Sequence, residues 1–185
     1  VGSVQMCIRD RFLDGARLGY GLAAPDNDLT LPDIAALCDV FYIGGTKVGA
    51  LFGEAVVIKN PELAQDFRYL IKQNGGMLAK GRLLGLQFDA LFTDGLYQVI
   101  SAHAIAMAEK LREAFTAKGY TYLAPNRTNQ IFVIVPDAHL AKISEQFEYS
   151  YDQRIDATHS CVRFCTSWAT KEENVDALIR CVEKL

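Results

Sequence analysis

The sequence has little net charge of either sign and no long hydrophobic run. Its 19 basic and 22 acidic residues leave a formal net charge of −3, so there is no cationic excess to attract nucleic acid or an anionic membrane. No apolar run reaches the roughly 18 residues that a membrane-spanning helix requires. We therefore expect neither a nucleic acid nor a membrane as a partner.

Cysteine is also scarce, and its spacing fits neither a disulfide framework nor a metal site. The number of cysteines is odd, and Cys161 and Cys165 lie in a strand-like run with no second pair to complete a set of metal ligands. We expect reduced and mostly buried thiols in a cytoplasmic protein, without a metal site. The five cysteines are Cys7, Cys38, Cys161, Cys165 and Cys181.

Two common phosphate-binding patterns are missing as well. In a P-loop the lysine is followed by serine or threonine, whereas Lys47 is followed by Val48. No Gly-x-Gly-x-x-Gly pattern follows a predicted strand. The glycine-rich segment 44–53 is therefore not predicted to bind a nucleotide.

What this segment does contain is a single lysine between two predicted strands. Residues 44–53 read Gly-Gly-Thr-Lys-Val-Gly-Ala-Leu-Phe-Gly, and β-branched and aromatic runs at 40–43 and 55–58 flank them. A partly desolvated lysine can have a lowered pKa and act as an amine nucleophile. Lys47 therefore indicates Schiff-base chemistry and a pyridoxal cofactor, although a solvated hairpin lysine would give the same pattern.

An aspartate at the end of another predicted strand strengthens this hypothesis. Phe12 and Leu13 look like the end of a strand, and Asp14 follows them directly. A carboxylate in that place can pair with a protonated pyridine nitrogen and keep the ring an electron sink. Alone, an aspartate before glycine is more simply a turn residue. Asp14 and Lys47 are 33 residues apart, which allows one strand-helix-strand passage that can bring both to one sheet edge.

The remaining pattern predicts an α/β protein in two pieces, with enough apolar residues, 50%, for a sizeable core. In the first piece, Thr30 and Asp33 begin a helix that runs through Leu37, and Pro61 begins one through about Lys72. A helical pattern then extends from about residue 79 to 118 and ends at Gly119.

The second piece changes to a strand pattern and ends in a helix. Thr170 and Glu173 suggest a capping box before that last helix. The other elements are a short helix at 139–145 and strands at 120–123, 130–135, 148–151 and 161–167.

These motifs together resemble the low-specificity threonine aldolases. Residues 13–18 read Leu-Asp-Gly-Ala-Arg-Leu, and 39–51 read Asp-Val-Phe-Tyr-Ile-Gly-Gly-Thr-Lys-Val-Gly-Ala-Leu. The match continues through 67–77, 128–132 and 162–168 and covers nearly everything from residue 12 to the end. The resemblance implies the aspartate aminotransferase-like fold of type I, which binds pyridoxal 5′-phosphate, with part of a large domain and a small C-terminal α+β domain.

The resemblance also assigns roles to individual residues. It implies that Lys47 binds the cofactor aldehyde covalently and that Asp14 pairs with the pyridinium nitrogen. Arg17 matches an arginine near the phenolic oxygen of the ring. Arg163 matches the arginine that holds the substrate α-carboxylate, a task suited to a bidentate guanidinium. The simpler alternatives are a surface ion pair for Arg17 and a solvated edge-strand arginine for Arg163.

The implied activity is cleavage of the Cα–Cβ bond of L-threonine or L-allo-threonine to glycine and acetaldehyde. Two alternatives remain open. One is a related β-eliminating lyase or aminotransferase on the same fold. The other is a non-enzymatic homologue that keeps the fold for subunit contacts, although such a scaffold would need neither Asp14 nor Lys47.

A basic pair after the glycine turn at 75–76 suggests a shared active site. In the family, such a residue can reach the cofactor phosphate of a neighbouring subunit, and Lys80 and Arg82 are both candidates here. A solvated first helical turn explains them equally well. We expect a homo-oligomer, a dimer or a tetramer. The histidines at 103, 139 and 159 match no catalytic position of the family.

We expect four segments along the chain. Residues 1–11 resemble a non-native adapter, 12–82 the C-terminal part of the cofactor-binding domain, 83–118 a long connecting helix, and 119–185 the small domain. No phosphate-binding turn or ring-stacking residue is recognisable before Asp14. We therefore expect the C-terminal portion of a longer enzyme, which alone would bind cofactor poorly and be inactive.

Overall fold

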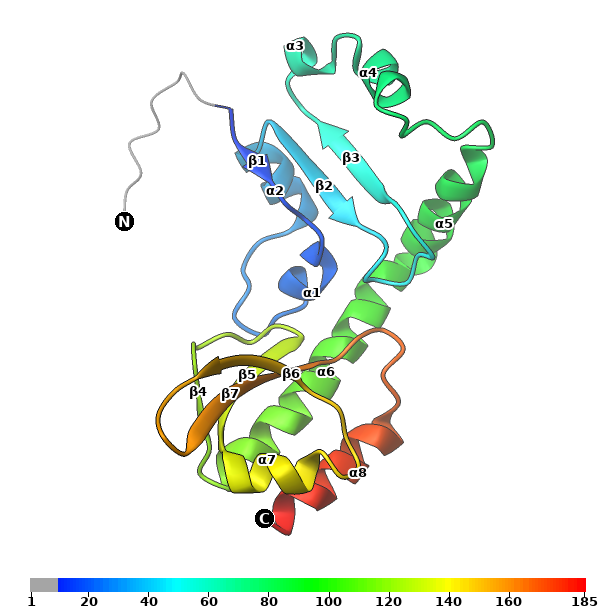
Figure 1. Cartoon of the computed structure of the whole chain (residues 1–185). Coiled ribbons are helices and arrows are strands. Elements are labelled where there is room, and N and C mark those ends of the chain that lie inside the picture. The colour runs from blue at the N-terminus through cyan, green and yellow to red at the C-terminus, as the bar shows by residue number, and fades with distance from the viewer. Residues whose placement is uncertain (1–9) are drawn as a thin grey trace. The chain divides into compact units, whose positions relative to one another are not determined.

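The computed structural model describes residues 10–185, which form two compact units. The first unit comprises the described residues through Leu22 together with Asp28–Leu96, and the second comprises Ala23–Asn27 and Tyr97–Leu185 (Figure 1). The boundary at residue 96 lies inside the segment that the sequence predicts as a connecting helix. The adapter-like character expected of residues 1–11 concerns a segment of which 1–9 lie outside the described residues.

A three-stranded sheet forms the centre of the first unit. The strands β1 (Phe12–Leu13), β2 (Val40–Gly44) and β3 (Glu54–Ile58) lie in the order β1-β2-β3. β1 and β2 are parallel, whereas β2 and β3 are antiparallel (Figure 1). Helices α1 (Leu18–Leu22) and α2 (Leu31–Leu37) connect β1 to β2. The predicted strand-helix-strand passage is confirmed.

The start of α2 also agrees with the sequence. Thr30 is the N-cap, its hydroxyl accepts from the backbone N–H of Asp33, and the Asp33 carboxylate accepts from the Thr30 N–H at 2.8 Å. This reciprocal pair satisfies two of the N–H groups that a helix leaves unpaired at its start. The Thr30 hydroxyl holds the Asp33 pKa below its usual value.

Two predicted helices are each interrupted by a residue in the left-handed conformation. The helix expected from Pro61 is split into α3 (Pro61–Ala64) and α4 (Phe67–Gln73) by Asp66 at φ 57°. The long helix expected over 83–118 is split into α5 (Arg82–Phe92) and α6 (Leu96–Ala117) by the 3₁₀ turn η1 (Thr93–Gly95), with Asp94 at φ 52°. Aspartate tolerates the left-handed conformation better than most residues. A helix can therefore end at Asp66 and at Asp94 even though the spacing of apolar residues continues past them.

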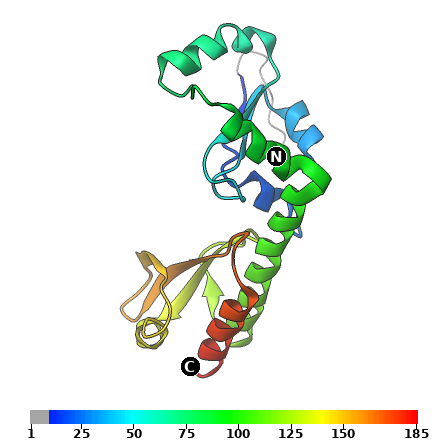
Figure 2. The ribbon, with the colours of Figure 1, turned by 90° about the vertical axis from the view of Figure 1, so that its right-hand side faces the viewer.

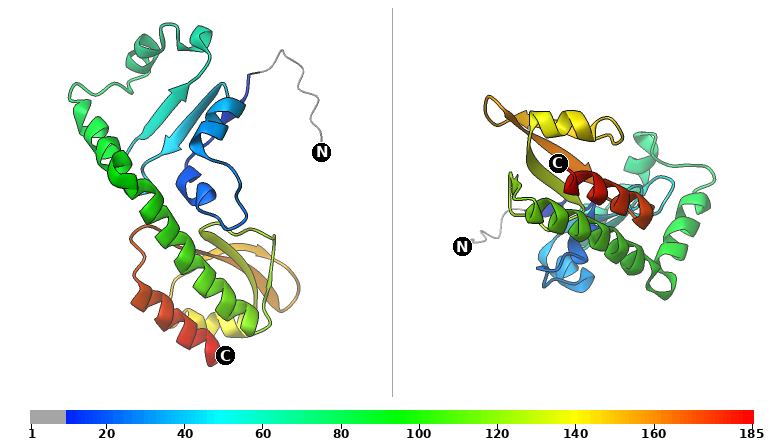
Figure 3. Two further views of the ribbon diagram at one scale, coloured as in Figure 1. Left: turned by 180° about the vertical axis from the view of Figure 1, so that it is seen from behind. Right: turned by 90° about the horizontal axis from the view of Figure 1, so that it is seen from below.

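The second unit is an antiparallel sheet with helices packed on its apolar face. Its strand order is β4-β5-β7-β6. The elements are β4 (Thr121–Tyr122), β5 (Gln130–Pro136), α7 (Asp137–Ile143), β6 (Ser150–Arg154), β7 (His159–Cys165) and α8 (Glu172–Glu183). Within this unit, α6 and α8 lie side by side (Figures 2 and 3), joined by an ion pair between Lys110 and Glu172.

One apolar core holds the second unit together. Alternate residues of β5 are fully buried, which is the period expected of a strand with one covered face. They pack against one face of α6 and α8 and against β7. The buried members include Phe115, Ile131, Val133, Val135, Val162, Phe164, Val175 and Val182.

Several details of this unit differ from the prediction: the helix expected at 139–145 is α7, two residues earlier, and the strand expected at 161–167 is β7, also two residues earlier. The hydroxyl of Thr170 accepts from the Ser167 N–H at 2.8 Å and does not cap α8, so the predicted capping box is wrong. The strand expected at 148–151 lies at Ser150–Arg154, and its pairing with β7 includes a bulge between Tyr151 and Gln153. Among residues 10–185, no helix has both the length and the apolar character needed to cross a bilayer.

Candidate active site

Asp14 and Lys47 follow the carboxyl ends of two neighbouring parallel strands. Asp14 comes directly after β1, and Lys47 lies in the 45–53 loop that follows β2. Because β1 and β2 are parallel, their carboxyl ends meet at one edge of the sheet. The structure therefore places the two residues at one edge, as their spacing predicts.

Glycines let the two chain segments touch through their backbones. The Gly44 N–H donates to the Gly15 carbonyl at 2.9 Å. A Cβ atom on Gly15 would stand 1.7 Å from the Tyr42 carbonyl oxygen, and one on Gly44 would stand 2.3 Å from the Ala16 carbonyl oxygen. Only glycine allows this approach, and the approach fixes the segment that carries Asp14 beside the loop that carries Lys47.

Three side chains hold the backbone of the lysine loop. The buried Tyr20 of α1 donates its hydroxyl to the Lys47 carbonyl at 2.5 Å. The Glu54 carboxylate accepts from the Gly45 N–H at 2.9 Å, and the Gln87 side chain accepts from the Leu51 N–H at 2.7 Å. The loop is thus tied to α1, β3 and α5, so the backbone position of Lys47 is well defined.

The side chain of Lys47 itself is exposed, in contrast to the partial desolvation expected from the sequence. The next residue, Val48, is fully buried, so its side chain anchors the loop in the apolar interior while the Lys47 side chain is in solvent. Within residues 10–185, no hydrogen bond or ion pair engages the Lys47 amine. The amine is therefore available to react with an aldehyde.

The carboxylate of Asp14 is held in its ionised form by its surroundings. The Tyr42 hydroxyl donates to Asp14 Oδ1, and the Ala16 N–H donates to the same oxygen at 3.1 Å. These hydrogen bonds, with the nearby charges of Lys47 and Arg17, lower the Asp14 pKa. The same contact raises the Tyr42 pKa to about 12.

The donor set fits a pyridoxal cofactor. No hydrogen bond from a described residue reaches Asp14 Oδ2, so this oxygen is free to accept a proton-bearing ring nitrogen. Arg17 lies in the turn that enters α1 and is close enough to Asp14 to lower its pKa. An unpaired primary amine, an ionised carboxylate and a guanidinium therefore occur together at the edge where β1 and β2 end.

Arg163 lies in the second unit, on the face of its sheet opposite the apolar core. Directly across on β5 is Phe132, over whose ring the guanidinium lies, 6.0 Å from the centroid. Its Nη1 donates to Gln130 Oε1 at 3.3 Å, and its buried Nε has no partner among the described residues. The guanidinium thus retains donors for a carboxylate, as the predicted role requires.

A buried pair of hydrogen bonds, made by Asn129 and Thr166, lies next to Arg163 where β5 begins and β7 ends. Asn129 donates from its amide to the Thr166 carbonyl at 2.7 Å, and the Thr166 hydroxyl donates to the Ala104 carbonyl of α6 at 2.7 Å. Gln130 and Cys165, the residues next to Asn129 and Thr166, are paired in the sheet register. The two hydrogen bonds therefore hold the ends of β5 and β7 together close to Arg163.

Lys80 and Arg82 stand at the start of α5, and both are exposed. No hydrogen bond or ion pair joins either side chain to another residue in the described part of the chain. Their contact with a cofactor phosphate stays a prediction.

The histidines and cysteines among residues 10–185 make no comparable cluster. His103 contacts the Thr170 carbonyl at 2.8 Å, and His139 contacts the Tyr120 hydroxyl at 2.7 Å. Over residues 10–185, no three His, Cys, Asp or Glu side chains are placed to hold a metal ion. The four described cysteines are free thiols, of which Cys165 is exposed, and Cys7 lies outside the described residues.

Two curated proteins are similar to this chain in sequence. Low-specificity L-threonine aldolases from a Pseudomonas species and from Pseudomonas aeruginosa are 31% and 28% identical over 170 and 169 residues. The alignments include 90% and 91% of this chain but 47% and 48% of those proteins, so the chain spans about half the length of the curated relatives it matches. No family model matches the sequence.

Solved structures define the fold class. The threonine aldolase of Leishmania major superimposes with a TM-score of 0.91 and 42% identity, over 94% of this chain and 51% of that one. Serine palmitoyltransferase of Sphingomonas wittichii, at 15% identity, has a TM-score of 0.63 over 94% of this chain and 46% of its own. The lysine aminotransferase of Mycobacterium tuberculosis, also at 15%, reaches 0.51 over 94% and 40%.

The fold is therefore the type I fold of the pyridoxal-phosphate-dependent enzymes, and the predicted fold class is confirmed. Within that class, the chain resembles the low-specificity threonine aldolases, as the motifs around Asp14 and Lys47 predict.

The sequence reasoning missed the residues that position Asp14 and Lys47. Tyr42 lies inside a quoted motif, and strand register could have identified it, because the parallel pairing of Leu13 with Phe41 puts Asp14 next to Tyr42. Tyr20, Glu54 and Gln87 carry no comparable signal, since their contacts depend on how α1, β3 and α5 meet the loop.

Proposed function

We propose that the intact protein containing this chain is a pyridoxal-phosphate-dependent aldehyde-lyase. It cleaves the Cα–Cβ bond of L-threonine or L-allo-threonine and releases glycine and acetaldehyde. The observation that carries this proposal is the meeting of Asp14, Arg17 and Lys47 where β1 and β2 end. The similarity to threonine aldolases from Pseudomonas and Leishmania supports the choice of reaction within the fold class.

Each residue has a task that its chemistry suits. Lys47 would hold the cofactor through a covalent bond from Nζ to the aldehyde carbon. Asp14, kept ionised by Tyr42 and Ala16, would hold the proton on the ring nitrogen. Arg163 would bind and orient the substrate carboxylate. When bound, the cofactor supplies an electron sink for the charge left at Cα.

The proposal includes a homo-oligomer, dimer or tetramer, in the cytoplasm. Lys80 and Arg82 are the candidates for contacting the cofactor phosphate of a neighbouring subunit. Their exposure and their lack of partners among the described residues leave both free for that contact.

Borohydride trapping with product analysis tests the proposal. The intact protein is incubated with pyridoxal phosphate, reduced, digested and analysed by mass spectrometry. We expect the cofactor mass on the peptide that contains Lys47, its loss in Lys47→Ala, and its retention in Lys59→Ala, a matched change at an exposed lysine of the same unit. Wild-type protein should release acetaldehyde and glycine from L-threonine, and Lys47→Ala should not.

Other outcomes identify the alternatives. Ammonia with a keto acid would indicate a β-eliminating lyase, and a transaminated acid would indicate an aminotransferase. No trapping on Lys47 would favour a non-enzymatic protein. Unchanged aldol cleavage in Lys47→Ala would end the proposal.

A further inference from the structure

We propose that Tyr42 is a positioning residue that holds Asp14 for its pairing with the cofactor ring. The inference rests on the proposed function, because Asp14 has this task only where a pyridoxal cofactor binds. Tyr42 itself has no assigned role, and it acts through the Asp14 carboxylate, with no contact to the cofactor required.

Strand register brings the two side chains together. Phe12 pairs with Val40 and Leu13 with Phe41, so Asp14 continues the parallel ladder opposite Tyr42. Successive residues of a strand point to opposite faces, and Phe41 and Ile43 are buried on one face while Tyr42 is half-buried on the other. The Tyr42 hydroxyl donates to Asp14 Oδ1 on that second face.

A neighbouring ring restricts the Tyr42 side chain. The rings of Phe12 and Tyr42 lie 6.1 Å apart between centroids, and Phe12 precedes Asp14 by two residues on the same face of β1. This contact keeps the hydroxyl at the end of β1. Replacement of Tyr42 by phenylalanine would keep the ring contact and remove only the hydroxyl.

The two hydrogen bonds on Oδ1 leave Oδ2 for the ring nitrogen. Tyr42 and the Ala16 N–H approach Asp14 from different sides of the sheet edge, one from β2 and one from the turn after β1. A carboxylate restrained at one oxygen has a fixed plane, so the direction of its second oxygen is set as well. Tyr42 is the largest contributor to the lowered pKa of Asp14, and together with the Ala16 N–H it sets the orientation of the carboxylate.

The charges near Asp14 and Tyr42 favour a charged carboxylate and a neutral hydroxyl, the two states that the hydrogen bond requires. Lys47 and Arg17 favour the ionised carboxylate, and Glu54, across from β2 on β3, disfavours ionisation of the Tyr42 hydroxyl. The hydroxyl consequently keeps its proton up to about pH 12 and donates to the ionised Asp14 carboxylate below that pH.

Nuclear magnetic resonance of tyrosine labelled with ¹³C at Cζ tests the pair without cofactor. The signal absent from Tyr42→Phe identifies Tyr42. We expect it to titrate near pH 12, as the Asp14 contact implies, and to move toward 10 in Asp14→Asn. A Tyr42 signal with ordinary titration that is unaffected by Asp14→Asn would overturn the proposal.

Cofactor binding to the intact protein tests the consequence. We expect the Kd for pyridoxal phosphate to rise about three- to tenfold in Tyr42→Phe, which is the size of the net contribution of an ordinary hydrogen bond. We also expect the pH below which cofactor binding is lost to be higher in Tyr42→Phe, because the Asp14 pKa rises without the Tyr42 hydrogen bond. A merely structural change would alter affinity without moving that limit.

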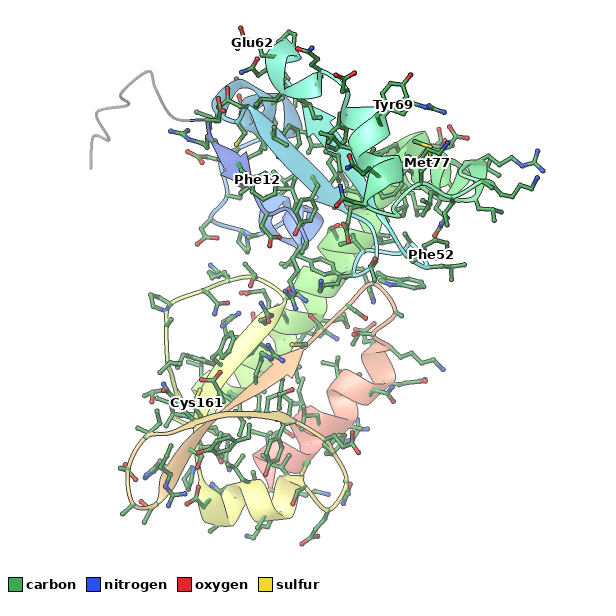
Figure 4. All side chains as sticks on the ribbon, turned by 45° about the horizontal axis from the view of Figure 1, so that its top comes forward. Phe12, Phe52, Glu62, Tyr69, Met77 and Cys161 are labelled. Atoms are coloured by element: carbon green, nitrogen blue, oxygen red, sulfur yellow. The ribbon has the colours of Figure 1, made fainter. Side chains whose placement is uncertain are left out.

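Tyr69→Phe is the matched control. Tyr69 on α4 is 73% exposed, and Figure 4 shows its side chain directed away from the ribbon, so the loss of its hydroxyl should change neither measurement. Wild-type affinity and pH limit in Tyr42→Phe would overturn the inference alone. A wild-type protein that binds no cofactor would overturn the inference and the proposed function together.

Discussion

The hydroxyl of Tyr20 donates to the backbone carbonyl of Lys47 at 2.5 Å. Tyr20 lies in the short helix that follows the Asp-Gly-Ala-Arg turn, and its side chain is 1% exposed. The helix that follows Asp14 thus also holds the loop that carries Lys47. A buried side chain donating to an exposed loop keeps the lysine backbone fixed while its amine remains free in solvent.

Replacing Tyr20 by phenylalanine should weaken this connection. We expect the free energy of unfolding to fall by about 1 kcal/mol, the usual effect of removing one hydrogen bond while retaining the ring. Urea denaturation measures this loss. Amide hydrogen exchange should also accelerate at Val48, whose N–H donates to the Gly45 carbonyl at 2.9 Å within the loop. Tyr151→Phe, at a tyrosine that is 61% exposed, should change neither quantity.

The backbone approach at Gly15 predicts a larger effect. Gly15→Ala should lower the free energy of unfolding by about 3 kcal/mol, because its Cβ would lie 1.7 Å from the Tyr42 carbonyl oxygen and the two segments would have to separate. Gly85→Ala in α5, where a Cβ meets nothing within 4 Å, should instead raise it by about 0.5–1 kcal/mol. Chemical denaturation of both variants checks the contrast, and equal effects would contradict it.

The β6–β7 turn predicts a stability change at acid pH. Backbone N–H donation from Thr158, with the His159 contact, lowers the pKa of Asp156 to about 2, against an ordinary value of 3.8. The ionised carboxylate therefore stabilises the fold fully above pH 3.8, and this contribution is lost as the pH falls toward 2.

Thermal denaturation between pH 6 and pH 2 measures this dependence. Asp156→Asn should have a lower Tm than wild type at pH 6, and the difference should shrink as the pH approaches 2. Asp152→Asn is the control, because it removes an equal charge from the exposed strand β6 and should not show this dependence of Tm on pH. A wild-type advantage over Asp156→Asn that stays constant down to pH 2 would contradict the assignment.

Arg163 predicts a separation of substrate binding from cofactor binding. In the intact protein, Arg163→Gln should lower kcat/KM for L-threonine by about 10- to 100-fold, mainly through KM, because a hydrogen-bonded charge pair with the carboxylate is lost. Cofactor affinity should remain at the wild-type level. Steady-state kinetics and cofactor titration test this, with Arg180→Gln at an exposed position of α8 as the control. A loss of cofactor affinity in Arg163→Gln would argue against a role confined to the substrate.

Local signals in the sequence predict several elements well. The Thr30–Asp33 capping box starts α2, and the β-branched runs at 40–43 and 55–58 form β2 and β3. Each depends on neighbouring residues, so the sequence alone carries the information.

The errors occur where the backbone adopts a conformation that periodicity does not report. Asp66 and Asp94 interrupt helical patterns with positive φ angles. Asp94 is followed by Gly95, itself at φ 70°, and this Asp-Gly pair was a turn signal within an otherwise helical run. Thr170 has the right spacing for a capping box, yet its hydroxyl is used by the preceding turn at Ser167.

The sequence by itself determined which chemical groups are present and how far apart they lie along the chain. Asp14 and Lys47, each at the end of a predicted strand, sufficed to indicate a pyridoxal site. Only the tertiary structure decided what surrounds them: Tyr42 on Asp14, Tyr20 on Lys47, and an exposed amine. These contacts join residues 27 or 28 positions apart, so they depend on strand register and backbone approach, which no local pattern encodes.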